Sequence, residues 1–187
     1  MNVVIFGPPG AGKGTQSSYI VKKFNLYQVS TGDLLRSEVK KKTDIGMDIE
    51  NIISKGDFAT DEIVNELIKN IISDPQKKNK LIFDGYPRSL NQAKNLKLLL
   101  ENSDQKIDFI FFLNVNKDTI IKRIEKRSIL EKRTDDNLNT ILKRYDTYKE
   151  TTKPVLDFYS KNPNFHEIDG DEEISIISSK IEQILLL

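Results

Sequence analysis

The sequence VVIF at residues 3–6 runs directly into GPPGAGKGTQ at residues 7–16. A short apolar strand followed by the pattern G-x-x-x-x-G-K-[ST] is typical of a loop that binds nucleotide phosphates. The glycines allow close backbone approach, so successive N–H groups can converge on phosphate oxygens. A helix expected to begin near Lys13 adds its free N–H groups and the positive end of its dipole. We therefore expect this chain to bind a nucleoside triphosphate.

Two side chains of the loop carry the expected chemistry. Lys13 would place an ammonium over the β- and γ-phosphates, and the Thr15 hydroxyl would complete the shell of a Mg²⁺ ion. The predicted ATP-binding residues of the loop are Gly10, Ala11, Gly12, Lys13, Gly14 and Thr15. The alternative is a glycine-rich turn that binds no phosphate, and the order of strand, loop and Lys-Gly-Thr disfavours it.

Length and composition fit one compact domain that has no large anionic partner. The chain has 187 residues, a formal net charge of +1 and 30% charged residues, a mixed surface that favours neither nucleic acid nor a membrane. It contains no cysteine, which excludes disulfides and thiolate metal sites. Neither a signal peptide nor a membrane-spanning run is visible. We expect a monomer in the cytoplasm, or in an organelle interior after import.

Strand-like runs alternate with segments of helical periodicity. The runs lie at residues 2–6, 26–29, 81–83, 109–113 and 165–168. This alternation indicates a parallel sheet covered by helices, which is an α/β fold. Between the second and third runs the chain is longer than one crossover helix requires, so we expect an insertion of short helices, punctuated by residues such as Gly46. The charge-dense segment 126–136 is expected to be exposed and mobile.

Two polar segments follow the second and third strands. They read STGDLLR at residues 30–36 and DGYPRSLNQ at residues 84–92. The phosphate-binding loop and both segments should meet at the carboxyl edge of the sheet. Asp84 at a strand end can hold Mg²⁺ through its water shell, or instead cap the following helix. Arg36 and Arg88 are candidates for binding a second phosphate, or are solvated surface residues.

More charged residues follow near the segment 126–136. They are Arg123, Arg127, Arg133, Asp135, Asp136 and Arg144. Such a set of cations favours phosphoryl transfer, because a donor with about four negative charges must meet a monophosphate with about two. The acceptor phosphate is already nucleophilic, so no general base is needed. The single histidine, His166, is therefore expected to be structural.

Together these segments resemble the nucleoside monophosphate kinases, and most closely the adenylate kinases with a short lid. Matching motifs occur in order at residues 7–16, 30–36, 84–88 and 133–137, and the similarity covers nearly the whole chain. The resemblance implies a P-loop nucleoside triphosphate hydrolase-type fold with a five-stranded parallel sheet flanked by helices.

The resemblance also implies a division of the single domain. Its core would comprise residues 1–29, 60–125 and 137–187. An AMP-binding insertion would occupy residues 30–59, and a lid that closes over ATP would occupy residues 126–136. The lid lacks the cysteine cluster of zinc-bearing relatives, so no zinc is expected.

The implied activity is reversible, Mg²⁺-dependent transfer of a phosphoryl group from ATP to AMP, giving two ADP. The catalytic residues would be Lys13, Arg88, Arg123, Arg127, Arg133, Asp135, Asp136 and Arg144. ATP would bind the loop together with Arg123, Arg127 and Glu172. AMP would bind Thr31, Arg36, Asp57, Phe58, Ala59, Gly85, Tyr86, Pro87, Arg88, Gln92, Arg133 and Arg144. Mg²⁺ would be held by Thr15 and Asp84, largely through water.

Base choice depends on Thr31 and Gln92, which in the adenylate kinase pattern read the adenine of AMP. Related UMP/CMP kinases usually have alanine and asparagine at these positions, so the sequence favours AMP. The chain departs from the pattern at Phe58 and Ala59, where leucine and valine are usual. Two alternatives stay open: a UMP/CMP kinase, or a sensor that binds ATP and AMP without turnover. Gln92 itself has the alternative of being a solvated helix residue.

Overall fold

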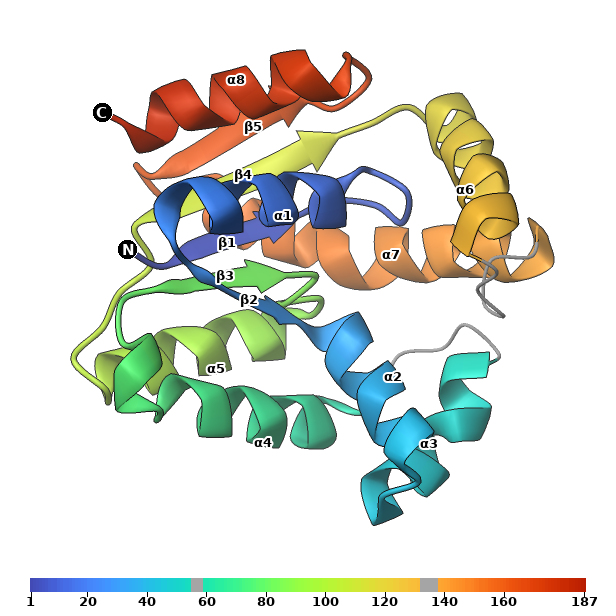
Figure 1. Cartoon of the computed structure of the whole chain (residues 1–187), viewed down its shortest axis with the longest axis horizontal. Coiled ribbons are helices and arrows are strands. Elements are labelled where there is room, and N and C mark those ends of the chain that lie inside the picture. Colours follow the sequence, from blue (N-terminus) through green and yellow to red (C-terminus); the bar gives the residue numbers. More distant parts are fainter. Residues whose placement is uncertain (55–58, 132–137) are drawn as a thin grey trace.

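The computed structural model describes residues 1–54, 59–131 and 138–187 (Figure 1). Its parallel sheet has the order β2-β3-β1-β4-β5. The strands are β1 (Val3–Phe6), β2 (Tyr27–Ser30), β3 (Leu81–Asp84), β4 (Phe109–Asn114) and β5 (Phe165–Asp169). Each lies within one residue of its expected bounds. The five-stranded α/β fold expected from the sequence is confirmed.

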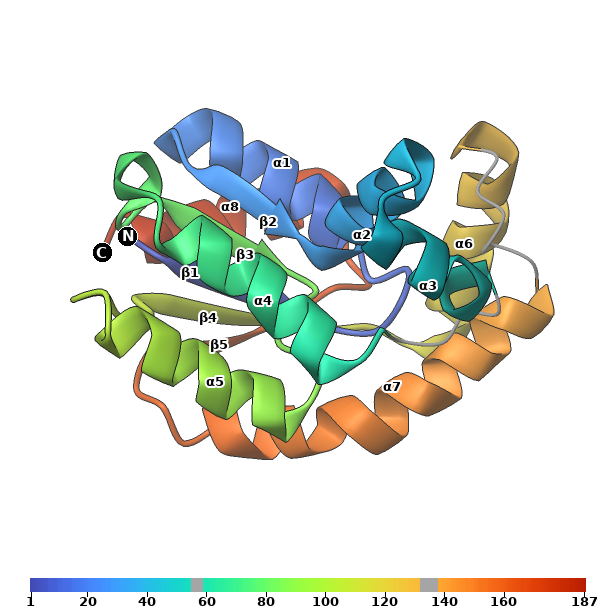
Figure 2. The ribbon, with the colours of Figure 1, turned by 90° about the horizontal axis from the view of Figure 1, so that it is seen from below.

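Helices cover both faces of this sheet (Figure 2). One face packs against α1 (Lys13–Phe24) and α8 (Ile174–Leu185), and the other against α4 (Asp61–Ile72), α5 (Leu90–Glu101) and α7 (Leu138–Tyr159). A short 3-10 helix, η1 (Pro75–Lys77), precedes β3. Within the three described ranges, no helix is both long and apolar enough to cross a membrane.

The central strand β1 shows why residues 3–6 are all apolar. Side chains alternate between the two faces of a strand, so Val4 and Phe6 join the α5 and α7 side while Val3 and Ile5 join the α1 side. All four are buried. Two hydrophobic cores therefore hold β1, and the loop that follows it starts from a rigid base.

The expected insertion begins at α2 (Thr31–Lys41) and α3 (Asp44–Ser54). Ser30 caps α2, because its hydroxyl accepts a hydrogen bond from the Asp33 N–H at 3.3 Å. Gly46 does not separate two helices, as the sequence suggested, but lies inside α3. A Cβ built there would lie 2.1 Å from the carbonyl oxygen of Glu38. Glycine at this position lets α3 pack directly against the backbone of α2.

The start of segment 126–136 differs from the exposed, mobile lid that we expected. Helix α6 runs from Lys117 to Glu131, so residues 126–131 continue a regular helix. The remainder of the predicted lid, residues 132–136, lies outside the described residues. The strand arrows in Figure 1 point toward the side where α2, α3 and α6 lie. The carboxyl edge of the sheet therefore faces both the insertion and α6.

Candidate functional site

The loop between β1 and α1 has the geometry of an anion site. Gly12, the residue before α1, has φ 92°, a left-handed conformation that side chains disfavour. No side chain caps this helix end, so its first N–H groups are available to an anion. At Gly10, with φ 78°, a Cβ would lie 2.7 Å from Ile124 Cγ1. Glycine at that position lets the loop pack closely against α6.

Lys13 points back into the loop. Its Nζ donates hydrogen bonds to the carbonyl oxygens of Gly7 and Pro8, both at 2.9 Å. Burial lowers the pKa of Lys13 to about 7, although the Asp84 carboxylate favours the charged form. The positive charges of Arg88, Arg144 and Arg127 lower this pKa further. A phosphate group would provide the negative charge that this cluster of cations needs.

Asp84 lies at the end of β3, near Lys13. The residue is only 8% exposed, and its Oδ2 accepts a hydrogen bond from Gln28 Nε2 at 2.9 Å. Burial raises the pKa of Asp84, and the nearby Lys13 charge opposes this shift. Asp84 does not cap the next helix, because Ser89 does so by accepting the Gln92 N–H at 3.1 Å. The capping alternative was therefore wrong.

Proton uptake on ATP binding should report on Lys13. At pH 8, above its pKa of about 7, Lys13 is largely neutral, and adjacent phosphates favour its ammonium form. We expect uptake of close to one proton per ATP at pH 8 and almost none from this group at pH 6, where it is already charged. Isothermal titration of Mg²⁺-free ATP in two buffers of different ionisation enthalpy measures this. A binding enthalpy that does not depend on the buffer at pH 8 would contradict it.

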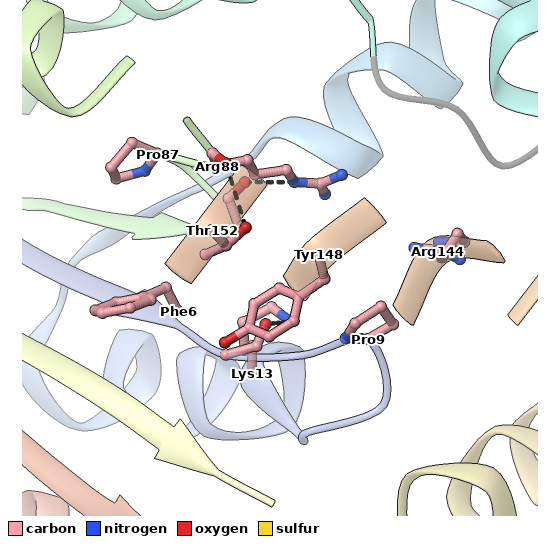
Figure 3. Close-up of a pocket in the computed structure, with 10 residues that line it drawn as sticks. Phe6, Pro9, Lys13, Pro87, Arg88, Arg144, Tyr148 and Thr152 are labelled. Atoms are coloured by element: carbon pink, nitrogen blue, oxygen red, sulfur yellow. Dashed lines mark hydrogen bonds between the residues drawn. The ribbon is translucent and has the colours of Figure 1, made fainter. Parts of the chain in front are cut away.

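A cavity lies between the loop, the turn after β3 and helix α7 (Figure 3). Lys13, Arg88 and Arg144 all line it, and they come from three separate segments of the chain. Arg88 Nε donates to the carbonyl oxygen of Gly85 at 2.8 Å. Thr152 Oγ1 donates to the Arg88 carbonyl oxygen at 3.2 Å. Side chain and backbone of Arg88 are thus both held in place.

Tyr148 and Thr152, which line this cavity, were not identified from the sequence. They follow Arg144 on α7 at intervals of four residues, so the three share one helix face. That spacing was visible in the sequence. Residues that pack in the core have the same spacing. Only the position of α7 against the loop shows that these residues line a cavity instead.

The expected base-reading residues lie next to the Arg88 turn. Thr31 is buried, and its Oγ1 donates to the Gly85 carbonyl oxygen at 3.0 Å. Gln92 is only 4% exposed, so the alternative of a solvated glutamine was wrong. The Tyr86 side chain is fully buried and donates to Asn65 Oδ1 at 2.7 Å. Unlike its neighbours Gly85 and Pro87, Tyr86 is not part of the cavity lining.

The remaining predicted residues are more scattered. Arg36 does not line the cavity and pairs with Asp33 Oδ1 at 2.6 Å on α2. Arg123 on α6 donates to the Glu172 carbonyl oxygen at 3.4 Å, which brings two predicted ATP contacts together. Pro87 and Gly85 line the cavity, and Ala59 is buried in the core on the α4 side. Five predicted residues lie outside the described ranges: Asp57, Phe58, Arg133, Asp135 and Asp136.

His166 has a structural environment. It lies on the edge strand β5, with its ring 5.7 Å from the Phe111 ring and 6.4 Å from the Phe109 ring. Burial lowers the pKa of His166 and so favours its neutral form. The cavity lining does not include it.

Comparison with known proteins gives a consistent result. The family model described as adenylate kinase matches residues 5–164. An adenylate kinase of Pelagibacter ubique is 50% identical, with 99% of each chain covered. Adenylate kinases of Parabacteroides distasonis and Mycoplasma capricolum are 38% and 37% identical, covering 98% and 91% of this chain and 96% and 92% of their own. The chain therefore belongs to the adenylate kinase family, whose enzymes transfer a phosphoryl group between ATP and AMP.

Proposed function

We propose that this protein transfers the γ-phosphoryl group of ATP to AMP, reversibly and with Mg²⁺, and so produces two ADP. The observation that carries the proposal is one cavity with Lys13 and Arg88 on either side and Arg144 beside them (Figure 3). Lys13 belongs to a loop suited to a triphosphate, and Arg88 to a separate turn suited to a second anion. Two anion-binding elements around one cavity suit a reaction between two phosphorylated substrates.

The proposed reaction is a direct displacement. A phosphate oxygen of AMP attacks the γ-phosphorus, the bond to the β,γ-bridging oxygen breaks, and ADP leaves. No proton has to be removed, because the acceptor phosphate is already anionic. The protein therefore acts by positioning and by charge. Lys13 offsets charge on the β- and γ-phosphates, Arg88 holds the acceptor phosphate, and Arg144 stabilises the group in transfer together with Arg133.

The other proposed roles follow the same division. Arg123, Arg127 and Glu172 would hold ATP, and Arg36, Ala59 and the turn at residues 85–87 would hold AMP. Thr31 and Gln92 would read its adenine. Asp135 and Asp136 would order the closed lid at residues 126–136 over the core. Closure of this lid and of the insertion at residues 30–59 would exclude water from the reaction.

Thr15 and Asp84 would hold Mg²⁺, largely through water. Hydroxyl and carboxylate oxygens are ligands that Mg²⁺ prefers. A Cβ built at Gly14, the residue before Thr15, would lie 3.7 Å from Asp84 Oδ2. The Asp84 carboxylate therefore lies against the start of α1. When bound there, the ion would offset charge on the β- and γ-phosphates. We propose no zinc site, because the sequence contains no cysteine.

The overall activity is tested by measuring ADP formation from ATP with AMP, UMP and CMP in turn. We expect AMP to be the best acceptor and Mg²⁺ to be required. A preference for UMP or CMP would contradict the proposed acceptor but not phosphoryl transfer. ATP and AMP binding without ADP formation would contradict the proposed catalysis. We further propose that the enzyme is a cytoplasmic monomer.

Replacement of Arg88 by alanine should affect the acceptor selectively. Because a charge-assisted hydrogen bond contributes about 1.5–3 kcal/mol, Arg88→Ala should weaken AMP binding by roughly 10- to 100-fold. ATP affinity should change by less than about threefold. Isothermal titration with each nucleotide measures both effects. Lys94→Ala, at an exposed position on α5, is the control, and an equal loss of both nucleotides in Arg88→Ala would count against separate sites.

A further inference from the structure

The side-chain amide of Gln92 is held at both ends by the protein. Its Oε1 accepts a hydrogen bond from the backbone N–H of Arg88 at 2.7 Å. Its Nε2 donates to Asp61 Oδ1, also at 2.7 Å. These two partners lie on different elements, since Asp61 begins α4 and Arg88 follows β3. The amide therefore has little freedom to rotate.

Asp61 uses both of its carboxylate oxygens in this arrangement. While Oδ1 accepts from Gln92, Oδ2 accepts from the hydroxyl of Ser89 at 2.9 Å. The same Ser89 oxygen caps α5 by accepting the Gln92 N–H at 3.1 Å. One carboxylate thus joins the first turn of α4 to the first turn of α5, where Gln92 lies.

The partners of Gln92 decide which end of its amide is oxygen. A carboxylate only accepts hydrogen bonds, and a backbone N–H only donates. A reversed amide would place its oxygen against the Asp61 carboxylate and its NH₂ against the Arg88 N–H. Since a glutamine amide has two donors and two acceptor lone pairs, one donor and one acceptor remain after these bonds. The remaining donor therefore lies on the Nε2 side, toward Asp61, and the remaining acceptor on the Oε1 side, toward the Arg88 N–H.

We infer that Asp61 is a positioning residue which fixes the amide of Gln92 in the orientation that selects a 6-amino purine over a 6-oxo purine. The inference rests on the proposed function, in which Gln92 contacts the acceptor base. Adenine presents an amino donor beside an acceptor ring nitrogen, whereas hypoxanthine presents a carbonyl acceptor beside a ring N–H donor. The reversed amide would suit hypoxanthine, and the Asp61 carboxylate opposes that reversal.

Asp61→Asn tests the inference with little change in shape. Asparagine offers both a donor and an acceptor, so it tolerates either orientation of Gln92. With ATP as donor, we expect the ratio of kcat/KM for AMP to kcat/KM for IMP to fall about 10-fold. The change should lie mainly in the KM values of the two monophosphates, while KM for ATP stays constant. Asp61→Ala, a second variant, should shift the ratio in the same direction.

Two further variants separate this role from support of the helix. Glu62→Gln removes the same charge from the same first turn of α4 at an exposed position, and its AMP-to-IMP ratio should equal that of the wild type. Gln92→Leu should lower the ratio by itself. Asp61→Asn should then add no further change to the ratio in the Gln92→Leu background, because the two residues act through one contact.

The possible outcomes are distinguishable. An unchanged ratio in Asp61→Asn, or equal losses for AMP and IMP, would overturn the inference and leave Asp61 as a structural residue. An additive effect of the two substitutions would overturn it as well. A wild-type enzyme that forms no ADP from AMP would instead contradict the proposed function, and this is measured before any variant.

Discussion

Lys13→Met should yield a folded protein that has lost phosphoryl transfer by a factor on the order of 10³ or more, about 4 kcal/mol of transition-state stabilisation. The β- and γ-phosphates lose their buried ammonium, and methionine keeps a similar length without the charge. Stability should change little. The lost hydrogen bonds to the Gly7 and Pro8 carbonyl oxygens are offset because a buried amine is no longer desolvated.

The measurement is steady-state ADP formation, together with thermal unfolding of the same preparation. Lys22→Met is the matched control, since Lys22 is exposed on the same helix α1, and it should keep wild-type turnover. Lys13→Met with wild-type turnover would refute the role of the loop in catalysis. A large fall in melting temperature would show that Lys13 is needed for the fold instead.

Arg144→Lys should slow the chemical step by a factor on the order of 10³ while ATP affinity changes little. Lysine keeps the positive charge, but it lacks the planar set of donors that can meet two oxygens of the transferring group at once. An arginine that acts mainly in the transition state should therefore affect the rate far more than ground-state binding.

Single-turnover kinetics and an equilibrium ATP titration separate these two quantities. Lys149→Arg makes the reverse exchange at an exposed position on the same helix, and both its rate and its ATP affinity should match the wild type. If Arg144→Lys weakens ATP binding but leaves the chemical step unchanged, Arg144 is a ground-state ATP contact rather than a transition-state residue.

Much of the fold could be predicted because its signals are local. The central strands β1, β3 and β4 are short, largely buried apolar runs with helices on both faces, and such runs end where polar residues begin. The phosphate-binding loop, the STGDLLR segment and the DGYPRSLNQ segment each follow a strand, and parallel strands bring their carboxyl ends to one edge. Lys13 and Arg88 therefore meet at one cavity, as the sequence suggested.

The parts that sequence reasoning missed depend on contacts between distant segments. The bonds of Asp61 to Ser89 and Gln92 span 28 and 31 positions. Gly46 appeared to interrupt a helix because a glycine allows both a break and a close approach. The distinction depends on where Glu38 of α2 lies, and no local pattern contains that information.

All arginines of the sequence are among the proposed site residues, whereas most of its positive charges away from the site are lysines. The two cations differ in function as well as position. Guanidinium groups bind phosphate oxygens in a fixed planar geometry, whereas lysines on the surface mainly add solvation and charge. Apart from Lys13, the composition thus separates the residues proposed to require a defined geometry from those that require only charge.

Helix α7 limits how the nucleotide preference of this enzyme can evolve. Arg144 lies near its start, and eight residues later, about 12 Å along the axis, Thr152 bonds the backbone of Arg88. A single helix therefore connects Arg144, which we propose stabilises the transferring group, to the turn that we propose holds AMP, and a shift of the helix at one end displaces the other. Changes of substrate are more accessible at the starts of α2 and α4, where Thr31 and Asp61 can vary without moving Arg144.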